Sequence, residues 1–165
     1  MLVPFNTLPK DARVWIYQSN REFSASELEL ISNNTERFIE TWTRHGENLK
    51  ASYTIKYNQF IVLGVDESFN DVSGCSIDSS VHFIKQLETK LNIDLTNKLN
   101  TAFKVGQNIN IVSLAQFQDF AKADKINADT IVFNNMVATK GDFDSNWEVK
   151  ASESWHQRFL NSTKI

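Results

Sequence analysis

The chain has 165 residues, of which 41% are hydrophobic and 22% are charged, and its formal net charge is −3. This composition excludes a disordered tail, because such segments carry too few apolar residues to form a core. No run of basic residues exceeds two, which argues against nucleic-acid binding, since that function depends on a concentrated basic surface that neutralises phosphates.

The single cysteine and the N-terminal residues indicate a cytoplasmic protein. Cys75 is the only cysteine, so no intramolecular disulfide can form, and a lone cysteine is typical of a reducing compartment. Residues 1–10 lack the cationic start and apolar stretch of a secretory signal. The longest apolar run, Phe60–Val65, is too short to span a membrane.

The chain opens with an arm, residues 1–12, that contains both prolines, Pro4 and Pro9. It has no periodic apolar pattern, so it is predicted to be irregular. The run Arg13–Gln18 that follows is dense in β-branched and aromatic residues, which predicts a strand.

A helix is predicted over residues 25–45. Ser24 and Glu27 have the spacing of a capping box, in which each side chain pairs with the other residue's backbone N–H. Apolar residues then recur at helical spacing up to Trp42. Gly46 provides a C-terminal stop.

The next two elements are predicted to form a β-hairpin. Residues 53–57 alternate between apolar and polar side chains, which is typical of a half-buried strand, and Phe60–Val65 is continuously apolar. Asn58 and Gln59 suit the tight turn between them. Gly64 marks either a bulge or a close approach of another segment.

A polar loop, residues 66–74, leads into a second predicted helix over residues 76–92. The order to this point is β-α-β-β-α. A closing strand near Phe103 or Ile109 would complete a ferredoxin-like βαββαβ unit. We therefore expect an α+β protein whose first unit spans residues 13–98.

Residues 99–165 are predicted to form a smaller β-α-β unit, packed either separately or as one domain with the first. A hairpin is expected around residues 106–108, and Ser113 is placed to cap a short helix. Strands are predicted at residues 130–133 and 147–149. A C-terminal helix is expected over residues 153–160.

Three segments resemble a family of short, uncharacterised bacterial proteins whose members often carry the label "ABC transporter ATPase". They are residues 74–84 (GCSIDSSVHFI), 130–135 (TIVFNN) and 154–160 (SWHQRFL). The label implies a phosphate-binding P-loop. That loop needs two glycines five residues apart, the second followed by Lys, and no glycine pair in this sequence has that spacing. ABC-type ATP hydrolysis is therefore not supported.

Residues 103–149 resemble the GYF-type modules. The likeness lies in residues 125–133 (KINADTIVF), followed by Trp147. It implies binding of a proline-rich peptide on an aromatic surface. The chain departs from the pattern at residues 111–114 (IVSL), where those modules carry a Gly-Pro-Phe turn.

One candidate site is the predicted start of the second helix, with Cys75, Ser76, Asp78 and His82. A helix N-terminus presents unpaired N–H groups that can receive an anion, and a thiol there can become reactive. Cys75 and His82 are seven residues apart, or about 10 Å along a helix, which is too far for a local nucleophile–base pair. In the alternative reading, Ser76 or Asp78 caps the helix and Cys75 packs as a small apolar residue.

The second candidate site is the aromatic cluster of Trp147, Trp155 and His156. Exposed aromatic residues mark interaction sites, whereas buried tryptophans would lock the C-terminal segment in place. The three histidines are too widely spaced for a local metal site, and no cofactor motif is present.

Taken together, these patterns favour a non-enzymatic cytoplasmic interaction or accessory protein that binds a peptide or protein partner. Two alternatives stay open. One is an anion-binding protein or enzyme centred on residues 75–82. The other is a transporter-associated protein, which rests on the family label.

Overall fold

The computed structural model describes residues 1–161, which form an α+β protein with four α-helices and three antiparallel sheets. Contacts divide the chain into two units. The first consists of Met1–Thr96 together with Ala138–Gly141. The second consists of Asn97–Val137 together with the residues from Asp142 onward.

The first unit is built on a three-stranded antiparallel sheet with the order β1-β5-β4. The strands are β1 (Arg13–Gln18), β4 (Ala51–Lys56) and β5 (Phe60–Val65). The predicted first strand and the hairpin are confirmed, but the first strand of the hairpin ends at Lys56, and the turn begins at Tyr57, where φ is 54°. Every residue of β5 is buried, as expected of an apolar central strand with neighbours on both sides.

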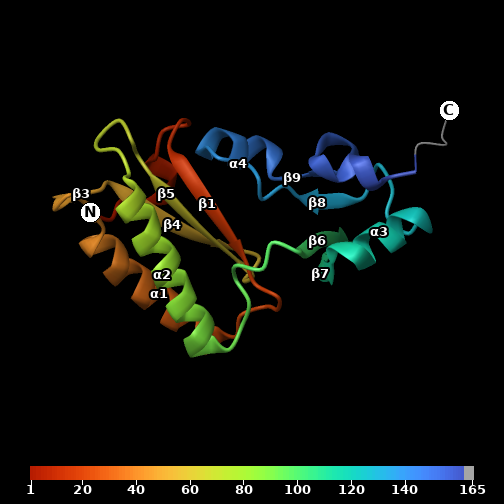
Figure 1. Ribbon diagram of the computed structural model, residues 1–165, viewed down its shortest axis with the longest axis horizontal. Helices are drawn as coiled ribbons and strands as arrows, with labels where there is room; N and C mark the ends of the chain where they lie inside the picture. Colours follow the sequence, from red (N-terminus) through yellow and green to blue (C-terminus); the bar gives the residue numbers. More distant parts are fainter. Residues whose placement is uncertain (162–165) are drawn as a thin grey trace. The chain divides into compact units, whose positions relative to one another are not determined.

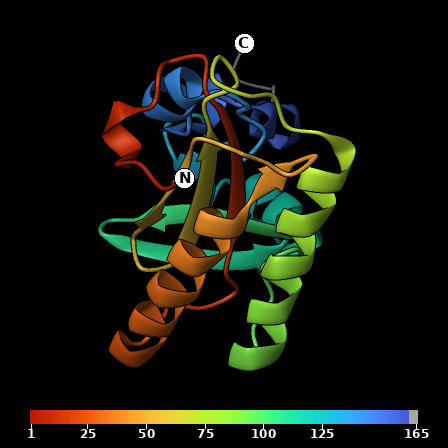
Figure 2. The same ribbon diagram turned by 90° about the vertical axis from the view of Figure 1, so that its left-hand side faces the viewer.

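Two long helices, α1 (Ala25–Thr41) and α2 (Gly74–Leu91), lie side by side against one face of this sheet (Figures 1 and 2). The capping box of Ser24 and Glu27 is confirmed. Helix and sheet residues share one core that includes Ile31, Leu63 and Phe83. Phe38 of α1 stacks on Phe83 of α2, with ring centroids 4.6 Å apart.

The predicted end of the first helix is wrong by four residues, because α1 stops at Thr41. Trp42 leaves the helical conformation, with ψ at 120°, and its side chain is buried. A small hairpin of β2 (Thr43–Arg44) and β3 (Glu47–Asn48) follows. His45 and Gly46 have φ values of 50° and 82°, so Gly46 belongs to a tight turn that needs positive φ and does not end a helix.

Gly64 marks a close approach and not a bulge. It pairs in regular register with Val14 and Ser52. A Cβ atom at this position would lie 2.7 Å from Leu8 Cδ1, so the missing side chain lets the N-terminal arm pack against the sheet face opposite the helices. Within that arm, Phe5–Thr7 forms the short 3-10 helix η1.

The ferredoxin-like closing strand predicted near Phe103 or Ile109 is not part of this sheet. Those residues lie in β6 and β7, which pair with each other in another sheet. The open side of β1 is instead occupied by Ala138–Gly141. Val14 N–H donates to Ala138 O at 2.9 Å, and Lys140 N–H donates to Ala12 O at 2.8 Å.

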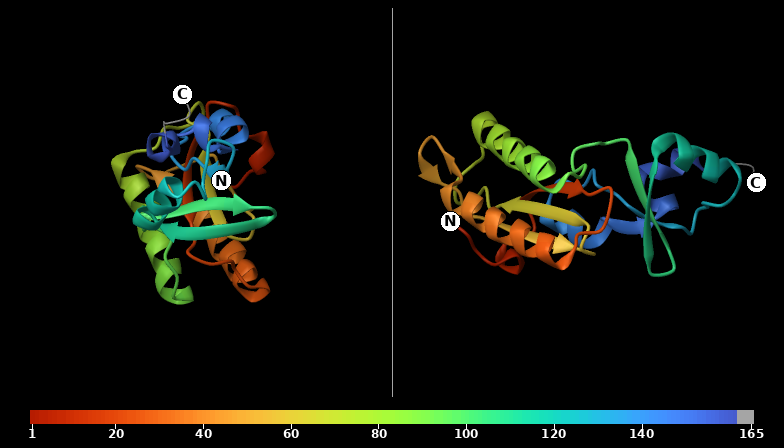
Figure 3. Two further views of the ribbon diagram at one scale, coloured as in Figure 1. Left: turned by 90° about the vertical axis from the view of Figure 1, so that its right-hand side faces the viewer. Right: turned by 90° about the horizontal axis from the view of Figure 1, so that it is seen from below.

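The second unit contains a four-stranded antiparallel sheet with the order β7-β6-β8-β9. Figure 3 shows β6 and β7 as a long hairpin. Helix α3 packs against this sheet through Phe117, beside Phe103 and Val132. The elements are β6 (Asn100–Val105), β7 (Asn108–Ser113), α3 (Leu114–Lys122), β8 (Ile131–Phe133) and β9 (Glu148–Lys150).

Two features of this region differ from the sequence-based expectation. The predicted C-terminal helix over residues 153–160 is replaced by two 3-10 helices, η2 (Ala151–Glu153) and η3 (Trp155–Phe159). Ser154 separates them because its backbone is extended. Helix α4 (Lys140–Asn146) was not predicted.

None of the helices in residues 1–161 combines the length and the apolar character needed to cross a bilayer.

Candidate functional site

The predicted site at the start of α2 does not converge into a pocket. Cys75, Asp78 and His82 are exposed, and none of them lines the groove described below. Ser76 is buried, and its hydroxyl donates to Thr43 O at 2.9 Å. The cap of the helix is Ser73, whose side chain accepts the Ser76 N–H, so neither Ser76 nor Asp78 has that role.

The side chain of His82 forms a hydrogen bond on its own helix, with Nε2 lying 3.3 Å from Gln86 Nε2. The thiol of Cys75 is free and exposed. Within residues 1–161, no three His, Cys, Asp or Glu side chains gather into a group that could hold a metal ion. The observed role of this segment is to start a helix.

In the second unit, Trp147 is only 4% exposed. Its ring packs against Phe133 and Phe143, each with centroids 4.9 Å away, and its Nε1 donates to Asn135 Oδ1 at 2.9 Å. A tryptophan held in this way stabilises the unit and presents little surface to a partner.

His156 is completely buried and stacks on Trp155, with ring centroids 3.7 Å apart. Its Nδ1 lies 2.7 Å from Ser154 Oγ. Neither His156 Nε2 nor Trp155 Nε1 has a hydrogen-bond partner in the described part of the chain. Burial, and to a lesser degree the nearby Arg158, lowers the pKa of His156 to about 4, so the ring is neutral at pH 7.

A site that was not predicted lies along the outer edge of β4. Ala51 N–H donates to Met1 O at 3.0 Å, and Ala51 O accepts from Val3 N–H at 2.9 Å. Backbone groups alternate in direction along an antiparallel strand. Those of Tyr53 and Ile55 therefore point to the same outer side as those of Ala51.

The N-terminal arm covers only the first part of this edge. It bridges to β4 at Leu2 and Ala51, and then turns away at Pro4 into η1. On their outer side, Tyr53 and Ile55 make no backbone hydrogen bond to any residue from 1 to 161. The rest of the edge is therefore open to another strand.

A shallow groove of about 550 Å³ runs beside this open edge. The arm contributes mostly apolar side chains, the strand contributes alternating polar and apolar ones, and α1 contributes a hydroxyl. The lining residues are Leu2, Val3, Pro4, Phe5, Ser32, Ser52, Tyr53, Thr54 and Ile55. The groove thus brings together three segments that are distant in sequence.

An acidic stripe on α1 flanks the groove. Ser32, Glu36 and Glu40 are spaced four residues apart and share one helix face with Glu29. Glu36 accepts a hydrogen bond from the Tyr53 hydroxyl, and Glu40 Oε1 accepts from Leu2 N–H at 3.0 Å. Burial and the Glu36 carboxylate raise the pKa of Tyr53, so its hydroxyl stays a donor.

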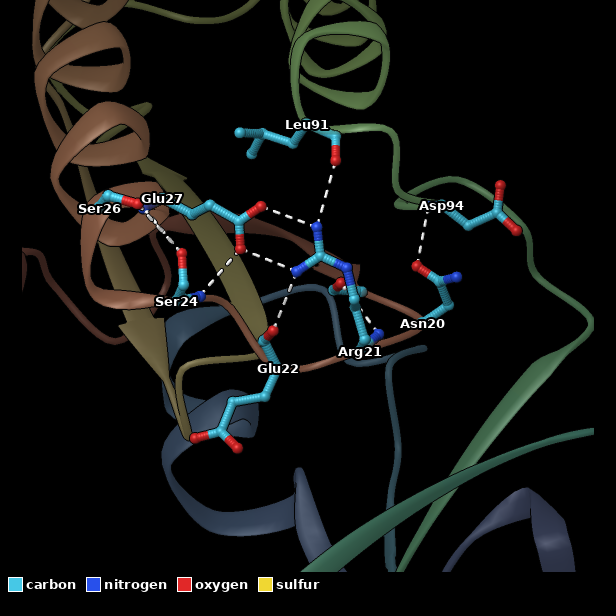
Figure 4. Close-up of polar contacts among 9 residues, drawn as sticks. Asn20, Arg21, Glu22, Ser24, Ser26, Glu27, Leu91 and Asp94 are labelled. Atoms are coloured by element: carbon cyan, nitrogen blue, oxygen red, sulfur yellow. Dashed lines mark hydrogen bonds and ion pairs between the residues drawn. The ribbon is translucent and has the colours of Figure 1, made fainter.

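A separate polar network ties the beginning of α1 to the end of α2 (Figure 4). Arg21 binds Glu27 through two hydrogen bonds of 2.8 and 2.7 Å and also donates to Leu91 O at 3.2 Å. The hydrogen bond from Arg21, with further help from Ser24, lowers the pKa of Glu27 to about 2. This network holds the two helix ends together, and none of its residues lines the groove beside β4.

Comparison with family models, with curated proteins and with solved structures finds no match. The resemblances to the short bacterial family and to the GYF-type modules therefore stay expectations from the sequence. The functional assignment has to come from the geometry of the site.

Proposed function

We propose that this chain is a non-enzymatic interaction protein that binds an extended segment of a partner as an added strand on the edge of β4. The observation that supports the proposal is the half-covered edge, with the outward backbone groups of Tyr53 and Ile55 lying beside a groove. In strand addition, main-chain hydrogen bonds provide affinity, and neighbouring side-chain pockets provide specificity.

The arm itself supports this mode of binding. Residues 1–3 already pair with the start of β4, so the edge accepts a strand at Ala51. Native sheets usually protect an edge, because open N–H and C=O groups recruit other chains. Among the described residues, the arm covers one end of this edge and the exposed Lys56 stands at the other.

Simple energetics indicate what the groove must contribute. Tyr53 and Ile55 offer four hydrogen-bonding groups, each contributing about 1 kcal/mol. The resulting total of about 4 kcal/mol is half of the roughly 8 kcal/mol that a micromolar complex requires. The remainder must come from side chains that enter the groove between the arm and α1.

The proposal also covers the cellular location of the protein and the fold type of its first unit. We infer a cytoplasmic location from the single cysteine. We also propose that the first unit is a ferredoxin-like arrangement in which a short segment, Ala138–Gly141, takes the place of the fourth strand. The antiparallel order β1-β5-β4, with two helices on one face, supports this comparison.

The test is selection of binders from a displayed library of random peptides against the full chain, repeated with Ile55→Pro and Ile55→Ala. Proline removes the outward N–H and is tolerated on the open side of an edge strand, whereas alanine removes a similar part of the side chain and keeps the N–H. We expect Ile55→Pro to weaken the selected peptides about tenfold more than Ile55→Ala does.

Amide hydrogen exchange provides a readout in the unmodified protein. A selected peptide should slow exchange at Tyr53 and Ile55, while Thr54, whose N–H faces β5, should change little. Failure to select any peptide, or equal binding by the proline and alanine variants without protection at Tyr53 and Ile55, would overturn the proposal.

A further inference from the structure

The two sides of the open β4 edge differ in chemistry. Gly64 and Ser52 face the sheet surface on which the arm packs, since a Cβ at Gly64 would contact Leu8 and Phe5. Tyr53 and Ile55 face the opposite surface, where they pack with the helices. An added strand would therefore present alternate side chains to the apolar arm and to α1.

The α1 side is negatively charged. Glu29, Glu36 and Glu40 are all exposed and follow the helix face that contains the groove residue Ser32. The hydrogen bonds that Glu36 and Glu40 accept come from a hydroxyl and from a backbone N–H. The neutral hydroxyl does not cancel the charge of Glu36. Glu40 binds Leu2 N–H beside the ammonium of Met1, which donates to Ile39 O at 3.4 Å, so Glu29 and Glu36 are the carboxylates most available to a cation.

Resting on the proposed function, we infer that the segment bound at this edge is basic: an extended peptide in which Lys or Arg alternates with apolar residues. The basic side chains lie toward the α1 stripe, and the apolar ones lie toward Pro4 and Phe5. Charge complementarity thus selects the sequence of the segment, while the backbone of β4 provides its alignment.

The same charges disfavour a second copy of this chain as the occupant. Antiparallel pairing of β4 with its own copy would bring two α1 stripes to the same side of the joined sheet. Like charges would then face each other across the junction, which is destabilising. A basic partner would instead place positive charges opposite the carboxylates of α1.

The experiment uses three short capped peptides in which valine alternates with lysine, serine or glutamate, titrated against the full chain at low and at physiological salt. We expect the lysine peptide to bind about tenfold more tightly than the serine peptide at low salt. The preference should shrink as salt screens the exposed charges, and the glutamate peptide should bind most weakly.

A variant without the α1 carboxylates tests whether this surface causes the preference for the lysine peptide. The triple change Glu29→Gln, Glu36→Gln and Glu40→Gln keeps a hydrogen-bond acceptor at each position and should abolish the lysine preference. A matched control removes three exposed carboxylates elsewhere, alters the net charge equally and should leave the preference intact. Its substitutions are Asp78→Asn, Asp119→Asn and Glu153→Gln.

The outcomes separate this inference from the proposed function. Equal binding of all three peptides, with loss of binding in Ile55→Pro, would overturn the basic preference and leave strand addition in place. Binding of none of them would overturn the inference, and the library selection alone would then decide strand addition. Concentration-dependent dimerisation that protects Tyr53 and Ile55 without peptide would assign the edge to a second copy.

Discussion

Within residues 1–161, each of the two units leaves polar groups without a hydrogen-bond partner, but in opposite surroundings. At the β4 edge of the first unit, the outward groups of Tyr53 and Ile55 are open to an incoming strand. In the second unit, His156 Nε2 is enclosed in the core beside Trp155. Water can satisfy a group at the surface, so it stays available to a partner. A buried unpaired group lowers stability and responds to pH.

Acidification should produce the largest effect, and it should act on the second unit. The folded-state pKa of His156 is about 4, below its ordinary value of 6.5, so the folded state favours the neutral ring. The unfolded chain therefore takes up the proton first as pH falls below 6.5, and stability decreases until about pH 4. At about 1.4 kcal/mol for each pKa unit, the total loss is about 3 kcal/mol.

This loss can be measured by denaturant unfolding at several pH values between 7 and 4. NMR resonances of the second unit report its unfolding. His156→Phe keeps an aromatic ring beside Trp155 and Phe117 and removes the titrating group, so it should flatten the pH dependence in this range. An unchanged slope in that variant would show that His156 is not responsible.

The next largest loss of stability should come from a proline substitution at the edge of β1, which Ala138–Gly141 covers. Lys140 N–H donates to Ala12 O at 2.8 Å, and Ala12 is completely buried. Lys140→Pro removes the donor and leaves a buried carbonyl unpaired, which should reduce the free energy of unfolding by about 2 kcal/mol. Position 140 begins α4, where proline is otherwise well accepted.

Lys140→Ala, which keeps the N–H, is the matched control. Ile55→Pro compared with Ile55→Ala gives the corresponding pair on the open edge, where the free energies of unfolding should differ by less than about 0.5 kcal/mol. If proline lowered the free energy of unfolding equally at the two positions, the β1 edge and the β4 edge would not differ in how far they are covered.

A smaller effect is expected at the network joining α1 to α2. The pKa of Glu27 is about 2, below its ordinary value of 4.5, so its contribution is present above pH 4.5 and is lost as pH falls toward 2. Because the Arg21 side chain is 44% exposed, solvent screens the pair, and Glu27→Gln should cost less than about 1 kcal/mol at pH 7.

The variant should also lose the pH dependence of the first unit below pH 4.5. Glu22→Gln, which removes the exposed neighbouring carboxylate, is the control and should have no effect. If the two variants behaved alike, the ion pair with Arg21 would not be the source of the shift.

Local signals in the sequence predicted most of the elements of the first unit. The capping box at Ser24 and Glu27 and the apolar run Phe60–Val65 each depend on neighbours in sequence, and both are confirmed. The end of α1 was misjudged because Trp42 continues the helical spacing. Its indole is instead buried after the chain has left the helix, where Nε1 donates to Ser76 O at 2.9 Å.

The β4 edge could not be predicted because it depends on strand order. Tyr53 and Ile55 read as ordinary residues of a half-buried strand, and nothing local shows which strand lies at the margin of a sheet. The expected fourth strand would have closed the β1 side, whereas Ala138–Gly141 closes it from far along the chain. Composition likewise gave no sign that His156 is buried.

The smallest effect should come from modification of Cys75. Its thiol is exposed on the first turn of α2 and is not among the groove residues, so iodoacetamide should react with the folded protein as fast as with the unfolded chain, within a few-fold. Carboxamidomethylation should leave both the unfolding midpoint and peptide affinity unchanged, because exposed side chains outside a packed region contribute little to stability.

If Cys75 reacted with iodoacetamide only after the protein unfolds, the start of α2 would be covered. Loss of peptide binding on modification would move the functional site from the β4 edge to residues 75–82 and revive the anion-site alternative.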